Sequence, residues 1–167
     1  MGAIALSELG RWFEGEAGRL VLYARHWLDP AAAEDVVQDV FVQLMLQRQK
    51  PDHIKAWLCR AVRNAALKQR RTGGRRQRRE ESFAADSPSW FEPSAVATVD
   101  VRYAETALAE LTEEAREIVI LRIWEGLTLA EIAGVVNAST AMVFRIYRRG
   151  LQQLRTKMGV LCQTKTN

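Results

Sequence analysis

The stretch TLAEIAGVVNASTAMVFRIYRRGLQQLR, residues 128–155, decides the fold of the C-terminal part of the chain. It begins with Thr128 and has Glu131 three residues later, which is the spacing of a capping box at the start of a helix. Apolar residues then recur at helical spacing as far as Val136. Asn137 comes next, and asparagine is, after glycine, the residue type that best tolerates a positive φ. The stretch therefore predicts a short helix that ends in a tight turn around Asn137.

After this turn, the same stretch predicts a longer and more basic helix, capped by Ser139 or Thr140. Apolar side chains recur along one side of it, at Val143, Tyr147, Leu151 and Leu154. Four arginines occupy its remaining surface, at Arg145, Arg148, Arg149 and Arg155. A basic helix beside a short bracing helix is the arrangement by which helix-turn-helix proteins place side chains in a DNA groove. The alternative is an ordinary helical hairpin whose basic face only contacts water.

Upstream of this stretch, Thr112 and Gly126 delimit another predicted helix. Thr112 is a favourable N-cap residue, and the two glutamates that follow it suit the positive end of the helix dipole. Gly126 predicts a helix end in the left-handed conformation. We also expect a helix from Arg102 to Glu110, so that the C-terminal domain, residues 101–158, contains about four helices.

Length and composition describe a folded all-α protein. The chain has 167 residues, of which 48% are hydrophobic and 26% charged, and this balance is typical of globular domains. Strand-like alternation is missing, so we expect an all-α fold with two small helical domains joined by a flexible linker. No apolar run approaches the roughly 20 residues that span a bilayer, and the N-terminus lacks a basic leader. We therefore expect a cytoplasmic protein without membrane insertion.

The sequence contains no constellation typical of an enzyme or a cofactor site. It has no glycine-rich phosphate loop, no Gly-x-Ser-x-Gly elbow and no His-Glu-x-x-His motif. His26 and His53 have no partners at ligand spacing, whereas zinc would need three or four converging ligands. Cys59 and Cys162 lie far apart in the sequence, as in a protein of a reducing compartment. We expect no enzymatic activity, no metal and no cofactor.

The N-terminal part of the chain predicts three helices. The first spans residues 6–27, and Gly15 and Gly18 allow a break in its middle. Its apolar bulk comes from Leu9, Trp12, Phe13, Leu20, Tyr23, Ala24 and Trp27. The second helix starts with Asp29 as N-cap and Pro30 as first helical residue, a strong start signal. Its predicted buried stripe consists of Val37, Val40, Phe41, Leu44 and Met45.

The third predicted helix, residues 54–71, begins a strongly basic run. Every ionised residue from Arg60 to Arg79 is positive, and such a density of cations is the electrostatic footprint of a polyanion, most simply a nucleic acid. Trp57 lies near these cations and offers a stacking face for an unpaired base. The alternative is an arginine-rich tail that only contacts water.

The charge reverses after this run. Every ionised residue in 80–100 is negative, and prolines interrupt the segment. We expect a flexible linker at residues 73–100, between an N-terminal domain at 6–72 and the C-terminal domain. Trp90 and Phe91 are unusual in a linker, and they would anchor it to a domain surface or to a partner.

Three segments in this order closely resemble the sigma factors of bacterial RNA polymerase: AEDVVQDVFVQL, then KAWLCRAVRNAALKQRR, then, after the linker, LTEEAREIVILRIWEGLTLAEIAGVV. Two domains with only a linker between them resemble the extracytoplasmic-function class. The resemblance implies a promoter-specificity subunit whose partners are core RNA polymerase, promoter DNA and an anti-sigma factor, while the polymerase supplies the chemistry. The alternative is a helix-turn-helix regulator that works without the polymerase.

The resemblance also implies roles for individual residues. A polar face of the second helix would dock on the polymerase, through Asp35, Gln38 and Asp39 with Phe41 beside them. From the residues alone, a solvated surface would explain this face as well. The third helix and the loop before it would capture the unpaired strand of the −10 element, through His53, Trp57, Arg60, Arg63, Asn64, Arg70 and Arg71. The last helix would read the −35 element, through Ser139, Thr140, Met142, Phe144, Arg145, Arg148 and Arg149.

The chain departs from the family pattern in both DNA-binding segments. Lys68 stands where the family usually has an aspartate, and MVFRIYRRG stands where it often has TVKSRLHRA. Met142 replaces a threonine there, Phe144 a polar residue and Ile146 an arginine. Phe144 is therefore either buried by a local rotation of the helix or in contact with a thymine methyl group.

Overall fold

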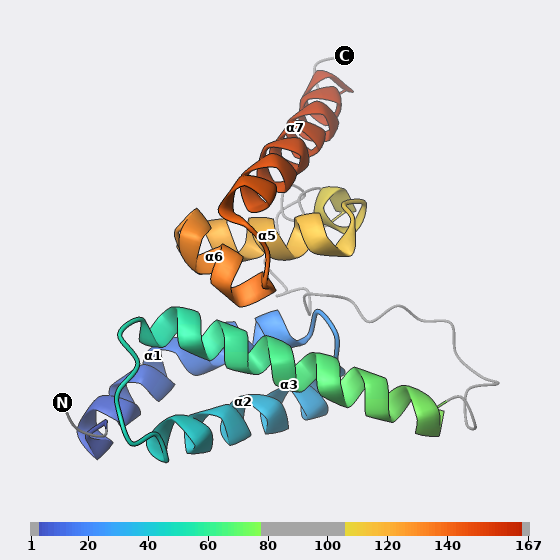
Figure 1. Cartoon of the computed structure of the whole chain (residues 1–167). Coiled ribbons are helices and arrows are strands. Elements are labelled where there is room, and N and C mark those ends of the chain that lie inside the picture. The colour runs from blue at the N-terminus through green and yellow to red at the C-terminus, as the bar shows by residue number, and fades with distance from the viewer. Residues whose placement is uncertain (1–3, 78–105, 165–167) are drawn as a thin grey trace. The chain divides into compact units, whose positions relative to one another are not determined.

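The computed structural model describes residues 4–77 and 106–164, and within these ranges all regular structure is helical (Figure 1). The chain divides into two compact units, Met1–Trp90 and Phe91–Asn167. The predicted all-α fold with two helical domains is confirmed. Most of the predicted linker, including Trp90 and Phe91, lies outside the described residues, as does the start of the helix predicted from Arg102.

The N-terminal unit is a bundle of three helices: α1 (Leu6–Ala24), α2 (Pro30–Met45) and α3 (Ile54–Gln77). Each helix contacts the other two, and they lie side by side in Figure 1. Their shared core contains the fully buried Leu20, Tyr23, Val37, Val40, Leu44, Leu58 and Val62. The α2 start is as predicted, because Pro30 is the first helical residue and the Asp29 carboxylate accepts a hydrogen bond from the Ala32 amide at 3.0 Å.

In this unit, the structure excludes the break that Gly15 and Gly18 allow in the first helix, and it contradicts the predicted burial of Met45. Helix α1 runs without a break through Gly15 and Gly18, because the packing of its apolar face outweighs the roughly 1 kcal/mol that each glycine costs in a helix. Met45 is 41% exposed and lies outside the core stripe of α2. Phe13 is 44% exposed and contacts the core only at its edge, through a T-shaped contact with Phe41 at 5.0 Å between ring centroids.

The C-terminal unit contains a helical turn at 106–109, then α5 (Glu113–Ile123), α6 (Leu129–Val136) and α7 (Thr140–Thr164). Helices α5, α6 and α7 all contact one another. Their most completely buried side chains are Ile118, Val119, Leu121, Ile132 and Val143. Thr112 caps α5 by accepting a hydrogen bond from the Ala115 amide, and Gly126 has a φ of 66°, so both predicted boundaries of this segment are confirmed.

Arg116 joins α5 to the chain that precedes it. Its guanidinium donates to the carbonyl oxygens of Leu108 at 2.9 Å, Ala109 at 2.7 Å and Leu111 at 3.0 Å. These carbonyls lie at and just beyond the end of the turn at 106–109, where a helix cannot satisfy them internally. Burial lowers the pKa of the Arg116 guanidinium from its ordinary value. The arginine therefore acts as a side-chain cap for a neighbouring helix end.

Candidate nucleic-acid interface

The turn between α6 and α7 has the geometry that its sequence predicts. The Thr128 Oγ1 accepts from the Glu131 amide at 3.2 Å, and the Glu131 carboxylate accepts from the Thr128 amide at 2.8 Å, which completes the capping box. Asn137 ends α6 in the left-handed conformation, with φ 57°. Ser139 then caps α7, because its Oγ accepts from the Met142 amide at 3.2 Å. The two helices meet at 103°, an angle typical of a helix-turn-helix.

The rotation of α7 about its axis is set by one closely packed face. Val143 is fully buried, and Gly150 is buried where α7 crosses α5. A Cβ at Gly150 would lie 3.4 Å from a methyl group of Val119, so the two helices approach closely at this glycine. Farther along the same face, Ile146, Tyr147 and Leu154 pack against Leu108, Leu111, Ala115 and Val119. The opposite face of α7 must therefore point away from its own domain.

All of the residues predicted to read the −35 element are exposed: Ser139, Thr140, Met142, Phe144, Arg145, Arg148 and Arg149. Phe144 is 45% exposed, which excludes its burial by a local rotation of the helix. Its neighbour Ile146 is half-buried and packs on the core, which explains why an apolar residue occupies that position. The guanidinium carbon of Arg148 lies over the Phe144 ring, 5.7 Å from its centroid.

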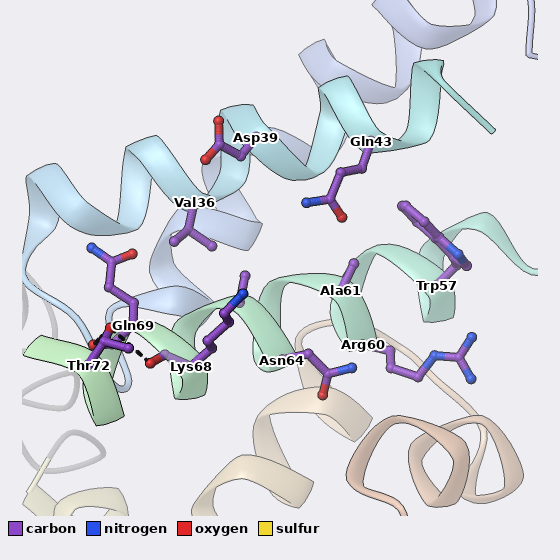
Figure 2. A pocket seen from close by; sticks show the side chains of 11 residues that line it. Val36, Asp39, Gln43, Trp57, Arg60, Ala61, Asn64, Lys68, Gln69 and Thr72 are labelled. Atoms are coloured by element: carbon purple, nitrogen blue, oxygen red, sulfur yellow. Dashed lines mark hydrogen bonds between the residues drawn. The ribbon is translucent and has the colours of Figure 1, made fainter.

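A second candidate surface is a groove of about 600 Å³ between α2 and α3 (Figure 2). Asp39 and Gln43 of α2 lie along one side, and residues of α3 line the other side. Three of the residues predicted for the −10 element line this groove, namely Trp57, Arg60 and Asn64. Lys68 lines it as well, so the departure from the family's aspartate places a cation in the groove. Gln43 also lines the groove, and no sequence pattern predicted its participation.

The remaining predicted −10 residues do not line this groove. Arg63 and Arg70 are separated by seven residues, which is two helical turns, so they share the flank of α3 away from the groove. His53 and Arg71 are exposed, at the loop before α3 and near its C-terminal end respectively. The cations of α3 are thus divided between two flanks of the helix. The end of the basic run, at 78–79, lies outside the described residues.

The polar face of α2 is a third candidate surface. Asp35, Gln38 and Asp39 are all exposed, as the predicted face requires. Phe41 is only 4% exposed and packs on Phe13, so it belongs to the core and offers almost no surface to a partner. Sequence reasoning missed exposed apolar side chains near the C-terminal end of the helix: Val42 at 51%, Met45 at 41% and Leu46 at 70% exposed. Val42 and Leu46 do not follow the helical period of the buried stripe, and this mismatch could have predicted their exposure.

In the described part of the chain, no group of three or more His, Cys, Asp or Glu side chains could hold a metal ion. No single helix in these ranges is both long and apolar enough to cross a membrane, and only the bent pair α6–α7, counted together, meets that requirement.

Comparison with known proteins places both units in one family. The model of Sigma-70 region 2 matches residues 12–76, and that of Sigma-70 region 4 matches residues 107–156. A curated relative, the ECF RNA polymerase sigma factor SigK of Mycolicibacterium vanbaalenii, is 29% identical over 147 residues, which cover 83% of this chain and 75% of the relative.

Two solved structures share the fold. The sigma factor RpoE from Bartonella quintana, in complex with the anti-sigma factor NepR, has a TM-score of 0.74 at 21% identity, covering 93% of this chain and 99% of RpoE. CnrH, in complex with the cytosolic domain of CnrY, has a TM-score of 0.61 at 20% identity, covering 93% of this chain and 90% of CnrH. With regions 2 and 4 present in this order, the chain belongs to the sigma-70 family of RNA polymerase sigma factors, and within it to the extracytoplasmic-function type.

Proposed function

We propose that this sigma factor directs promoter recognition and DNA opening at a specific set of promoters through three separate surfaces. The α2 face of Asp35, Gln38 and Asp39 docks on core RNA polymerase, the α2–α3 groove takes the unpaired −10 strand, and the outward face of α7 reads the −35 duplex. The chain supplies recognition only, and the polymerase carries out the phosphoryl transfer. This division of roles is supported by one observation: all three surfaces are exposed, and each lies on a different helical face.

The docking role of α2 is supported by its mixture of charge and exposed apolar surface. Acidic groups steer a basic partner and suppress wrong partners, but they add little affinity by themselves. Apolar side chains that stay exposed in the free protein supply that affinity when a partner covers them. Val42 of the same helix and Leu46, the residue that caps its C-terminal end, meet this requirement, being 51% and 70% exposed. We therefore extend the docking surface from the three polar residues to these two apolar ones.

The groove between α2 and α3 has the chemistry that an unpaired base requires. Its volume of about 600 Å³ lies within the range of small-molecule sites. Trp57 is half-buried and presents an aromatic surface, on which bases of any sequence can stack. Asn64 can hydrogen-bond to a base edge, while Arg60 and Lys68 attract the phosphates. A base flipped out of the duplex would find both stacking and polar contacts in this groove.

The experiment that tests the proposal is assembly with core enzyme. We expect the wild type to co-elute with core polymerase, and the double variant Asp35→Lys/Asp39→Lys to lose this binding. The matched control is Glu14→Lys/Glu114→Lys, which changes two other exposed acids and the net charge by the same amount. A wild-type protein that bound promoter duplex alone but never joined core polymerase would instead be a regulator that works without the polymerase.

A second experiment compares promoter opening with duplex binding, since the proposal assigns these two steps to different surfaces. Arg63→Ala/Asn64→Ala should impair promoter opening, measured by permanganate reactivity of unpaired thymines, more than duplex binding. Since Asn64 lines the groove and Arg63 lies on the other flank, the two single variants separate base capture from backbone attraction. Equal loss of opening and duplex binding in the Asn64 variant would contradict the proposed role of the groove.

We also propose that an anti-sigma factor regulates this chain. The support is that one structural relative, RpoE, was solved with such a partner, and this relation covers 93% of the chain. We expect a tagged copy of this chain to co-purify with a small protein that releases it for binding to core polymerase. Recovery of the tagged chain with core enzyme alone, under all growth conditions, would argue against this form of regulation.

A further inference from the structure

We infer that Phe144 is a specificity residue that contacts the 5-methyl group of a thymine in the −35 element, and that its ring also holds Arg148 in position. The inference rests on the proposed function, since it requires that α7 enter the major groove. It concerns the position at which this chain departs from the family pattern by placing an aromatic residue on the reading face.

The first support is that the packing of α7 on its own domain makes Phe144 face outward. The burial of Val143 on one side and the packing of Ile146 and Tyr147 beyond it prevent α7 from rotating about its axis. The close approach at Gly150 fixes the position of the helix along α5. Phe144 therefore remains 45% exposed, in the second turn of α7, where helix-turn-helix proteins contact base edges.

The second support is the surroundings of the ring. Phe144, Arg145, Arg148 and Arg149 line one continuous open hollow along α7. These arginines would draw the phosphate backbone onto this face, and the ring would then lose its water. A single exposed phenylalanine on a protein surface is ordinary, but this ring lies among cations, and a polyanion held by them would cover it.

The third support is chemical. In the major groove, thymine alone among the four bases presents a methyl group, and an apolar side chain is the natural contact for it. The guanidinium of Arg148 lies 5.7 Å from the centroid of the Phe144 ring, a distance at which the ring attracts the cation. The ring thus limits the conformations of Arg148 and directs its donors toward the same part of the groove. Phe144 is a direct contact for the methyl group and a positioning residue for Arg148.

The experiment uses the complete chain bound to core polymerase. The preferred −35 duplex is first selected from random DNA by this holoenzyme, and each thymine in it is then replaced by deoxyuridine, which removes only the methyl group. We expect at least one position at which the wild type loses about fourfold in affinity, the value of one buried methyl group. Phe144→Ala should bind the thymine and uracil duplexes equally well, while still binding DNA.

Two further variants separate the two roles of the ring. Phe144→Leu keeps an apolar side chain without a π face, so we expect it to retain the preference for thymine. In that background, however, Arg148→Ala should cost less affinity than it does in the wild type, because Arg148 is no longer positioned. Met158→Ala is the control, since Met158 is as exposed as Phe144, at 45%, and lies on the same helix far from its N-terminal end.

The outcomes distinguish this inference from the proposed function. If the holoenzyme selects no −35 sequence, the proposed reading role of α7 fails. If it selects one that contains no thymine, or binds thymine and uracil duplexes equally, α7 still reads DNA but Phe144 does not read a methyl group. If Phe144→Ala keeps the thymine preference, another side chain is responsible and the inference is overturned.

Discussion

Replacing Arg116 by alanine should destabilise the C-terminal unit more than any other single change of a surface cation in that unit. The side chain donates three hydrogen bonds to main-chain carbonyls, at 2.9, 2.7 and 3.0 Å. Each such bond contributes roughly 1 kcal/mol net, so their loss should cost about 2–4 kcal/mol, the upper part of the range applying if the carbonyls stay buried without a partner. Because a lysine has a single cationic nitrogen, Arg116→Lys should recover only part of this loss.

Hydrogen exchange measured by mass spectrometry on the complete chain can test this estimate. We expect amides of α5 and α7 to exchange between 30-fold and several hundredfold faster in Arg116→Ala, following the estimated loss of about 2–4 kcal/mol. Helices α2 and α3 belong to the other unit and serve as the internal control. Arg122→Ala is the matched variant, since Arg122 donates one bond, to the Leu127 carbonyl at 2.8 Å. Equal acceleration of exchange in α5 and α7 by both variants would contradict the capping role of Arg116.

Substitutions at three other residues test single local features of the structure. Asn137→Gly should leave the thermal stability of the C-terminal unit almost unchanged, whereas Asn137→Val should cost about 1–2 kcal/mol, because only the latter conflicts with the φ of 57°. A hydrogen bond from Lys50 lowers the pKa of Glu8, so the stabilisation by this pair is fully present above the unfolded pKa of Glu8 and is lost as the pH falls through the folded pKa. Lys50→Met should return the pKa of Glu8, measured by NMR, toward its ordinary value. An unchanged titration of Glu8 would contradict the pairing. Arg145→Ala should weaken −35 binding on all sequences alike and reduce the slope of log affinity against log salt by about 1, if Arg145 contacts a phosphate; a loss confined to particular sequences would indicate a base contact instead.

The features that sequence analysis predicted well are those decided within a few residues. The caps at Asp29, Thr112 and Thr128 and the left-handed residues Gly126 and Asn137 all follow from short-range chemistry, and the structure contains every one of them. A side-chain oxygen can reach an amide three residues away wherever the rest of the protein lies. The positions of the helices could therefore be predicted, and with them the all-α fold.

The composition of each helical face was less predictable, because a residue at the edge of a stripe can be buried or exposed depending on its neighbours. Met45 fits the stripe of α2 by period but remains 41% exposed. Phe41 lies in the core, as the buried stripe predicts, although the family resemblance had also placed it beside the docking face. Arg60 and Arg63 were both predicted to bind the −10 strand, yet only Arg60 lines the groove. These outcomes depend on where α1 and α2 lie against α3, which no local pattern specifies.

The same contrast applies to the stretch from Thr128 to Arg155. By itself, this sequence determined that two helices meet at a capped turn and that the second helix is basic, since caps, turn residues and charges are local properties. Only the tertiary structure decided that Ile146 packs inward and Phe144 faces out, because that choice is made by distant residues of α5 against which α7 packs. The rotation of a helix about its axis is set by what it packs against, and so is the set of side chains that it can offer to DNA.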